Sequence, residues 1–356
     1  MSDAAVDTRS RMEEELRRAR LRNIKGWSYL LSAGPTPGAS AKEVIRSRGT
    51  MKLYHYRPLS DEIYRVPVLL VMATTNKAYI FDMAPGQSLV EFMLKRGYDV
   101  YVLDWDPPRA DESRLRLEDY TQDFIPDCVR EITARTGEPD VSIIGYCMGG
   151  VLSVIYAALH AGGPLKNLIC LTTPFDWSKY GLFNAWSDGR HFDVDTLVDS
   201  QGNMPSDLIF AAFDALRPAT KLTKQIEVWD NMWNDEYVKS YRLMDRWSNE
   251  TLPLAGEYFR QLTKELMFDN KLVKGDLVVG GKKADVAAIR VPFLHAVAQH
   301  DHIVPYDASR ELVTRIGSDD KEEVVFKGGH VSLLAGGNAV RRLWPKLDAW
   351  LGQRSE

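Results

Sequence analysis

The most informative stretch of the chain is Val141-Ser142-Ile143-Ile144-Gly145-Tyr146-Cys147-Met148-Gly149. The apolar, β-branched residues at its start predict a buried strand, and the apolar residues 151–159 that follow it predict a helix. A glycine lies two residues to each side of Cys147, which is the spacing of a sharp strand–turn–helix elbow. Such a turn lifts the central side chain clear of the sheet and places it at a helix N-terminus, where the helix dipole favours a thiolate. The pattern indicates a cysteine nucleophile; the alternative is a glycine-rich turn that holds a buried, inert cysteine.

Two further residues supply the partners that a cysteine nucleophile needs. The run 291–298 reads as a strand and is followed by Asp301, and the short run 323–326 is followed, after two glycines, by His330. Each residue lies just past the C-terminal end of a predicted strand, where open α/β sheets place their active sites. The chain order of nucleophile, acid and histidine is that of the α/β hydrolases. We therefore predict a catalytic triad of Cys147, Asp301 and His330.

The residues near the predicted acid also have plainer interpretations. Asp301 fits a helix cap or a turn carboxylate, and His330 fits a loop histidine that is satisfied by water. His302 is a candidate accessory residue, although most histidines beside a catalytic acid only shape the loop. The histidines of this region lack the accompanying cysteine and carboxylate spacing of a metal site, so we expect no metal.

Length and composition exclude several classes of protein. The chain has 356 residues, of which 45% are apolar and 26% are charged, an ordinary mixture for a chain with a large core. A net charge of −4 gives no electrostatic footprint for nucleic acid. The three cysteines form no C-x-x-C pair, which favours a reducing compartment. Neither a signal-peptide core nor an apolar run of about 20 residues is present, so we expect a cytoplasmic protein with no transmembrane segment.

Predicted strands and helices alternate along the chain and favour a mostly parallel sheet flanked by helices, which is an α/β-hydrolase fold. After the predicted strand at about 168–171, the pattern changes to tryptophan-rich, short helical runs, with no strand pattern before Val291. An insertion at this point predicts a largely helical cap over the active site. The expected divisions are an N-terminal helical and linker segment (1–50), the core (51–175 and 289–356) and the cap (176–288).

The chain resembles a known enzyme family over nearly its whole length after residue 50. The resemblance rests on the segments 76–82, 104–105, 145–150, 173–177, 202–205, 301–305 and 328–330. On these segments the chain is similar to the short catalytic subunit of polyhydroxyalkanoate synthases, of the class III-like type that works with a second, non-catalytic subunit. Three positions or segments depart from the family pattern, namely Ala78, Asp106 and the segment 247–253.

This resemblance implies acyl transfer from (R)-3-hydroxyacyl-CoA, such as 3-hydroxybutyryl-CoA, to a growing polyester chain. Cys147 would attack the thioester carbonyl and expel CoA, His330 would act as general base, and Asp301 would orient His330. The oxyanion would be met by the backbone N–H of Met148 and by one from the loop near Thr75 or Asn76. No cofactor is implied, because the substrate itself carries CoA. The resemblance also implies a second synthase subunit, a homo-oligomer and a location at the surface of polyester granules.

Two other functions remain open on the sequence. A cysteine esterase, thioesterase or polyester depolymerase would use the same fold and triad with water as the acceptor. A catalytically idle scaffold at polymer granules is less favoured, because all three triad positions are filled.

Overall fold

A mostly parallel sheet forms the centre of the computed structural model, which describes residues 3–32, 34–181, 184, 188–216 and 220–356. The strand order in the sheet is β1-β2-β4-β3-β5-β6-β9-β10. The pairs β1–β2 and β2–β4 are antiparallel, and the remaining neighbours are parallel. This arrangement confirms the predicted fold class. The strands are β1 (Lys42–Arg48), β2 (Met51–Tyr56), β3 (Val68–Val71), β4 (Val100–Trp105), β5 (Val141–Tyr146), β6 (Leu165–Leu171), β9 (Phe293–Ala298) and β10 (Lys321–Phe326).

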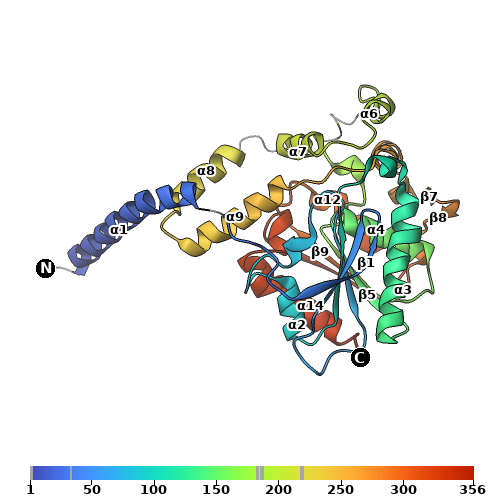
Figure 1. The fold of residues 1–356 in the computed structure, drawn as a ribbon, viewed down its shortest axis with the longest axis horizontal. Helices are drawn as coiled ribbons and strands as arrows, with labels where there is room; N and C mark the ends of the chain where they lie inside the picture. Colours follow the sequence, from blue (N-terminus) through green and yellow to red (C-terminus); the bar gives the residue numbers. More distant parts are fainter. Residues whose placement is uncertain (1–2, 33, 182–183, 185–187, 217–219) are drawn as a thin grey trace. The chain divides into compact units, whose positions relative to one another are not determined.

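Helices cover both faces of this sheet. Figure 1 shows α2 (Leu89–Lys95) and α14 (Trp344–Gly352) on one face and α3 (Ile125–Thr136) on the other. Because both faces are covered, the central strands are buried along their whole length, as β3 and β5 are. The other α-helices of the core are α4 (Met148–Leu159), α12 (Tyr306–Ser309) and α13 (Glu311–Arg315).

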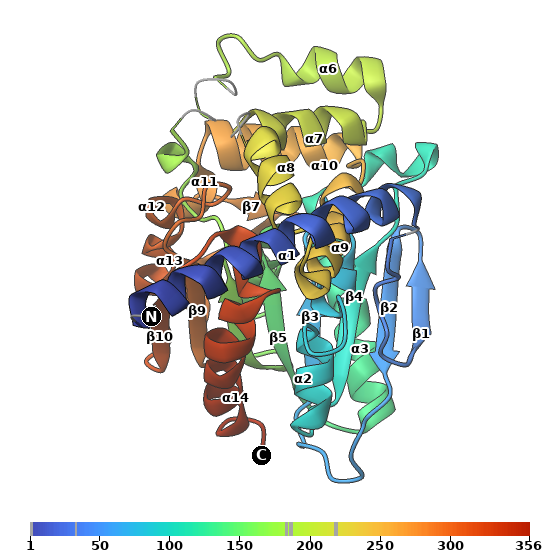
Figure 2. The same cartoon turned by 90° about the vertical axis from the view of Figure 1, so that its left-hand side faces the viewer.

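The insertion after β6 is largely helical, as predicted, and lies in the sequence between β6 and β9. Figure 2 shows α6, α7 and α10 beyond the carboxyl ends of the parallel strands, where Asp301 and His330 also follow β9 and β10. The helices of the insertion are α6 (Val194–Gln201), α7 (Ser206–Ala215), α8 (Thr220–Asp230), α9 (Asp235–Asn249), α10 (Gly256–Gln261) and α11 (Lys271–Lys274).

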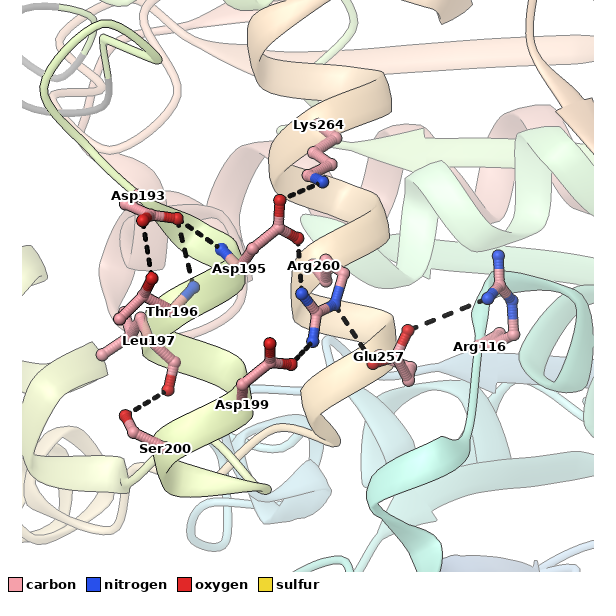
Figure 3. A network of polar contacts seen from close by, with 10 residues as sticks. All are labelled: Arg116, Asp193, Asp195, Thr196, Leu197, Asp199, Ser200, Glu257, Arg260 and Lys264. Atoms are coloured by element: carbon pink, nitrogen blue, oxygen red, sulfur yellow. Dashed lines mark hydrogen bonds and ion pairs between the residues drawn. The ribbon is translucent and has the colours of Figure 1, made fainter.

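A network of charged side chains attaches α6 to α10 and to the π-helical turn η5 (Leu262–Phe268) that continues it (Figure 3). The guanidinium of Arg260 donates to the carboxylates of Asp195 and Asp199 on α6, and Lys264 also pairs with Asp195. The backbone supports the same contact, because Gly256 approaches the carbonyl of Gly202 so closely that an added Cβ would lie 1.9 Å from that oxygen. These ion pairs and the close backbone approach join α10 to α6.

A second compact unit consists of residues 1–37 and 217–249. In it, α1 (Asp3–Leu31) packs with α8 and α9: Lys25 lies 2.7 Å from Asp235, and the Arg18 guanidinium lies 4.5 Å from the ring centre of Trp233. Within the described residues, no helix combines the length and the apolar character that crossing a membrane requires.

The structure differs from the expected divisions in three places. Strand β1 belongs to the sheet, although it lies in the segment 1–50 that was predicted as helix and linker. Residues 217–249 of the predicted cap cluster with the N-terminal helix, whereas the remainder of the insertion clusters with the core. The insertion also contains a two-stranded hairpin of β7 (Val278–Val279) and β8 (Lys282–Lys283), where no strand was expected. Its strands of two residues are too short to show a hydrophobic period.

Candidate active site

Cys147 lies at a sharp turn between β5 and α4. Its backbone has φ 54° and ψ −122°, a conformation that a residue with a Cβ rarely adopts. The glycine at 149 is required because an added Cβ would lie 2.2 Å from the carbonyl oxygen of Val71 at the end of β3. At Gly145 an added Cβ would lie 2.5 Å from the Cα of Gly150. The elbow that the glycine spacing predicted is therefore present, and it leaves the thiol half-buried at the start of α4.

The predicted acid and histidine form a buried pair. The Nδ1 atom of His330 lies 2.7 Å from the Oδ2 atom of Asp301. The Oδ1 atom of Asp301 accepts hydrogen bonds from the backbone N–H groups of Ile303 and Val304, at 2.9 and 2.8 Å. Both carboxylate oxygens are therefore occupied, and the carboxylate fixes the orientation of the imidazole ring.

The electrostatics of His330 connect this pair to the thiol. Burial alone would lower the pKa of His330, but the negative charges of Asp301 and Cys147, together with hydrogen bonds to both, raise this pKa to about 10. At neutral pH the ring therefore holds both of its protons. The Tyr146 ring lies against it, with the two ring centres 5.1 Å apart. The structure thus brings together Cys147, Asp301 and His330, and their catalytic roles stay a prediction.

The other predicted site residues lie near this triad in the chain or in the fold. Met148 is the first residue of α4, directly after Cys147. The loop after β3 is held in place because the carbonyl of Thr75 accepts a hydrogen bond from Leu252 N–H at 2.7 Å and Asn76 forms a β-bridge with Thr251. Whether the N–H groups of Met148, Thr75 and Asn76 bind an oxyanion stays a prediction. The accessory role of His302, which is partly exposed beside the acid, also stays a prediction.

Three tyrosines near the nucleophile were given no role by the sequence analysis. Burial raises the pKa of Tyr146 and Tyr180 well above the usual value, and the charges of Cys147 and Asp301 raise it further. Burial likewise raises the pKa of Tyr258, a hydrogen bond with Thr74 lowers it, and the charge of Cys147 raises it. Tyr146 could have been found by its place in the elbow motif. Tyr180 and Tyr258 could not, because they reach the site only through the fold of the segments after β6.

No cluster of three or more histidine, cysteine, aspartate or glutamate side chains that could hold a metal ion occurs among residues that the structure describes.

Comparisons with known proteins define the class of this chain first. A sequence profile described as alpha/beta hydrolase fold matches residues 66–336. A lipase-like protein of Sulfolobus solfataricus, described as a putative lipase, superposes with a TM-score of 0.56 at 15% identity, over 88% of this chain and 99% of that protein. A hydrolase of Pseudomonas aeruginosa superposes with a TM-score of 0.53 at 16% identity, over 88% of this chain and 100% of the other. At these identities the likeness shows the fold alone: the chain is an α/β hydrolase in architecture.

Closer relatives define the family within that class. A profile described as the N-terminus of poly-beta-hydroxybutyrate polymerase (PhaC) matches residues 27–93. The poly(3-hydroxyalkanoate) polymerase subunit PhaC of Thiocystis violacea is 35% identical, over 93% of this chain and 94% of its own length. The PhaC subunit of Allochromatium vinosum is 34% identical over the same shares, and that of Haloferax mediterranei is 31% identical over 92% of this chain and 66% of the longer relative. The chain belongs to the poly(3-hydroxyalkanoate) polymerase PhaC family, whose members are acyltransferases.

Proposed function

We propose that this chain polymerises (R)-3-hydroxyacyl-CoA, such as 3-hydroxybutyryl-CoA, through thioesters of Cys147. The observation that carries the proposal is the strained elbow at Cys147 combined with the buried pair of His330 and Asp301. A sulfur nucleophile suits a thioester substrate, because transfer of the acyl group from one thiol to another is close to thermoneutral and keeps that group activated.

In the first step the Cys147 thiolate attacks the thioester carbonyl carbon. A bond forms from that carbon to the cysteine sulfur, and the bond to the CoA sulfur breaks. The CoA thiolate leaves with the proton of the His330 imidazolium, which leaves the ring neutral. The N–H groups of Met148 and of Thr75 or Asn76 stabilise the transient oxyanion.

In the second step the chain is lengthened by one unit. Once Cys147 is acylated it carries no charge, so it no longer raises the pKa of His330, and the neutral ring becomes a base. His330 takes the proton of the 3-hydroxyl of a second acyl-CoA, whose oxygen attacks the acyl-cysteine, and an ester bond replaces the thioester. Cys147 leaves as a thiolate beside the imidazolium, and it then takes the lengthened chain from CoA by repeating the first step.

The insertion 176–288 acts in this proposal as a cap that limits access of water to the acyl-cysteine. Hydrolysis of that intermediate would end the chain, so a covered site favours transfer. The part of the insertion that clusters with the core lies beyond the carboxyl ends of the strands, which supports this role (Figure 2).

A second, non-catalytic subunit completes the enzyme in this proposal. The support is that the relatives are named as polymerase subunits. We also propose a homo-oligomer that works in the cytoplasm at the surface of polyester granules, where the insoluble product gathers. Light scattering of the purified chain measures its oligomeric state. Fluorescence microscopy of a tagged chain in polymer-forming cells tests its location at the granules.

The central experiment incubates the purified chain with 3-hydroxybutyryl-CoA and measures both free CoA and insoluble polymer. Cys147→Ala serves as the control without a nucleophile, and each assay is repeated after co-expression with the genomic neighbours of the gene. We expect CoA release and polymer together, and more of both with the partner. Free hydroxy acid without polymer in either condition would instead support an esterase or thioesterase. Full polymerase activity of the isolated chain would contradict the two-subunit assignment.

A further inference from the structure

Two neighbouring side chains at the end of β4 bind the loop that follows β3. Asp104 and Trp105 are the last two residues of β4, and both are buried. The Oδ1 atom of Asp104 accepts a hydrogen bond from the backbone N–H of Ala78 at 2.9 Å. The indole N–H of Trp105 donates to the carbonyl oxygen of Met72, also at 2.9 Å. Because successive strand residues point to opposite faces of a sheet, the loop 72–78 is held at both of its ends and from two sides.

The middle of this loop has hydrogen bonds of its own. The ammonium group of Lys77 donates to the backbone carbonyl of Trp105 at 2.6 Å. The carbonyl of Thr75 accepts from Leu252 N–H at 2.7 Å. The peptide that joins Thr75 to Asn76 is planar and trans, so the N–H of Asn76 points away from Leu252. The direction of this N–H is therefore set by the bonds that fix the loop.

The carbonyl that Trp105 binds also lies against the nucleophile elbow. An added Cβ on Gly149 would lie 2.8 Å from the carbonyl carbon and from the carbonyl oxygen of Met72. Gly149 is the second residue of α4 and follows Cys147 by two residues. The start of α4 and the loop after β3, from which the oxyanion donors are expected, thus meet at the carbonyl that the indole fixes. Donors that are in place before charge develops need no reorganisation, so their effect depends on how exactly this meeting point is held.

The surroundings of the two side chains keep them in position. The Trp105 ring packs edge-on against the Tyr120 ring, with the ring centres 5.2 Å apart. Burial raises the pKa of the Asp104 carboxyl, whereas the charge of Lys77 and the hydrogen bond from Ala78 N–H act in the opposite direction. A carboxyl oxygen accepts a hydrogen bond in the charged and in the neutral form. The bond to Ala78 therefore requires an acceptor atom at this place and does not require a charge.

We propose that Asp104 and Trp105 are positioning residues for oxyanion stabilisation. They fix the loop after β3 against the start of α4, so that a loop N–H meets the oxyanion that forms when Cys147 attacks the thioester. Both side chains act through the backbone of the loop and leave the substrate untouched. This inference rests on the proposed function, because it needs Cys147 as the nucleophile. The fixed loop strengthens binding of the negative oxygen and leaves binding of the uncharged thioester as it is.

The first test compares Trp105→Phe with wild type, because phenylalanine keeps a packed ring and removes the indole N–H. First-turnover release of CoA from 3-hydroxybutyryl-CoA should slow about 10-fold, a part of the roughly 100-fold that the loss of a whole oxyanion donor costs. Affinity is measured for two CoA analogues. One carries a trifluoromethyl ketone in place of the thioester and forms an anionic adduct with Cys147, and the other is a thioether that cannot react. Affinity for the ketone should fall by the same factor as the rate, while affinity for the thioether should not change.

Trp344→Phe is the matched control for the loss of ring volume. Trp344 is a buried residue of α14, and its indole N–H has no hydrogen-bond partner among the residues that the structure describes. The control therefore shrinks a buried ring without removing a hydrogen bond. It should change neither the rate nor the affinity for either analogue.

A second pair of variants tests the other end of the loop. Asp104→Ala leaves the N–H of Ala78 without its acceptor and should lower both the rate and the ketone affinity about 10-fold. Asp104→Asn keeps an oxygen that can accept this hydrogen bond and should restore most of both. Circular dichroism and thermal unfolding of each variant ensure that only folded chains are compared, and Trp105→Phe decides the matter if Asp104→Ala does not fold.

The outcomes distinguish the two proposals. Unchanged rate and ketone affinity in folded Trp105→Phe, or an equal loss of thioether affinity, would overturn the positioning role and leave the nucleophile assignment intact. Asp104→Asn that is as impaired as Asp104→Ala would overturn the role of the hydrogen bond to Ala78. A wild-type chain that releases no CoA and forms no ketone adduct would overturn the proposed function, and the positioning role with it.

Discussion

The protonation of His330 is the sharpest physical test of the thiol, imidazole and carboxylate arrangement. Its pKa is raised from 6.5 to about 10 against the effect of burial, by Asp301 and Cys147 together. At about 1.4 kcal/mol per pH unit, this rise corresponds to a net preference of roughly 5 kcal/mol for the charged ring, after the opposing effect of burial. Cys147→Ala removes the contribution of the thiol and leaves that of Asp301. The pKa of His330 should therefore fall in this variant, and it should fall below 6.5 when Asp301→Asn is added, because burial then acts alone.

Nitrogen-detected NMR of histidine side chains labelled with ¹⁵N measures this titration directly. The His330 signals are assigned by their loss in His330→Gln. In wild type both ring nitrogens should stay protonated through neutral pH. A wild-type midpoint near 6.5, or a midpoint that Cys147→Ala leaves unchanged, would refute the coupling between thiol and ring.

The raised pKa of His330 also makes the stability of the fold depend on pH, and it predicts a loss of stability as the pH rises. The native ring binds its proton up to about pH 10, whereas the unfolded ring releases it near 6.5, so the stabilising contribution is complete below pH 6.5 and is lost as the pH rises toward 10. The difference in free energy of unfolding between wild type and His330→Gln should therefore shrink over this range in denaturant titrations. A difference that grows with pH would contradict the assigned direction.

Three further changes test separate parts of the structure. Cys147→Ser should abolish most CoA release, because a hydroxyl is the weaker nucleophile at neutral pH. Cys170→Ala, at a fully buried strand position, should keep turnover, and the reverse result would reassign the nucleophile. Gly149→Ala should lower the free energy of unfolding by about 1–3 kcal/mol or more, since its Cβ would meet the β3 backbone, while Gly34→Ala, with open space around it, should have little effect in the same denaturant titration. Arg260→Gln, which removes the ion pairs with α6, should speed amide hydrogen exchange in α6. Added salt, which screens these pairs, should do the same to wild type. The matched change Arg190→Gln removes an ion pair with Asp188 and should leave the exchange of α6 unchanged.

The core of the fold was predictable because its signals are local. The runs 141–144, 291–298 and 323–326 were predicted as strands and correspond to β5, β9 and β10. The predicted and observed ends of these strands differ by at most two residues. These segments are short, apolar or β-branched, and each is followed by the loop that carries a polar site residue. The strained backbone of Cys147 was also foreseeable, since the spacing of its glycines has few other uses.

The parts that the sequence did not reveal depend on contacts between distant residues. Strand β1 consists mainly of exposed polar residues, so it lacks the alternating pattern by which a strand is recognised. The pairing of Lys25 with Asp235 joins α1 to α9 across 210 residues, and that of Thr74 with Tyr258 spans 184. No local spacing encodes such pairs, and so neither the second unit nor the contact between Tyr258 and Thr74 could be predicted.

The two outermost strands carry a consequence for how copies of the chain meet. An unpaired strand edge is a template for adding another chain, which is a hazard for any protein that reaches a high local concentration. Here β1 has Lys42, Arg46 and Arg48 on its exposed rim and an irregular register between Val44 and Arg46, and β10 begins with Lys321 followed by two glutamates. Charged residues at both rims, together with the irregular register of β1, oppose pairing with a strand of another copy. If copies of the chain gather at a polymer surface, as proposed above, they should therefore not aggregate by pairing these two strands edge to edge.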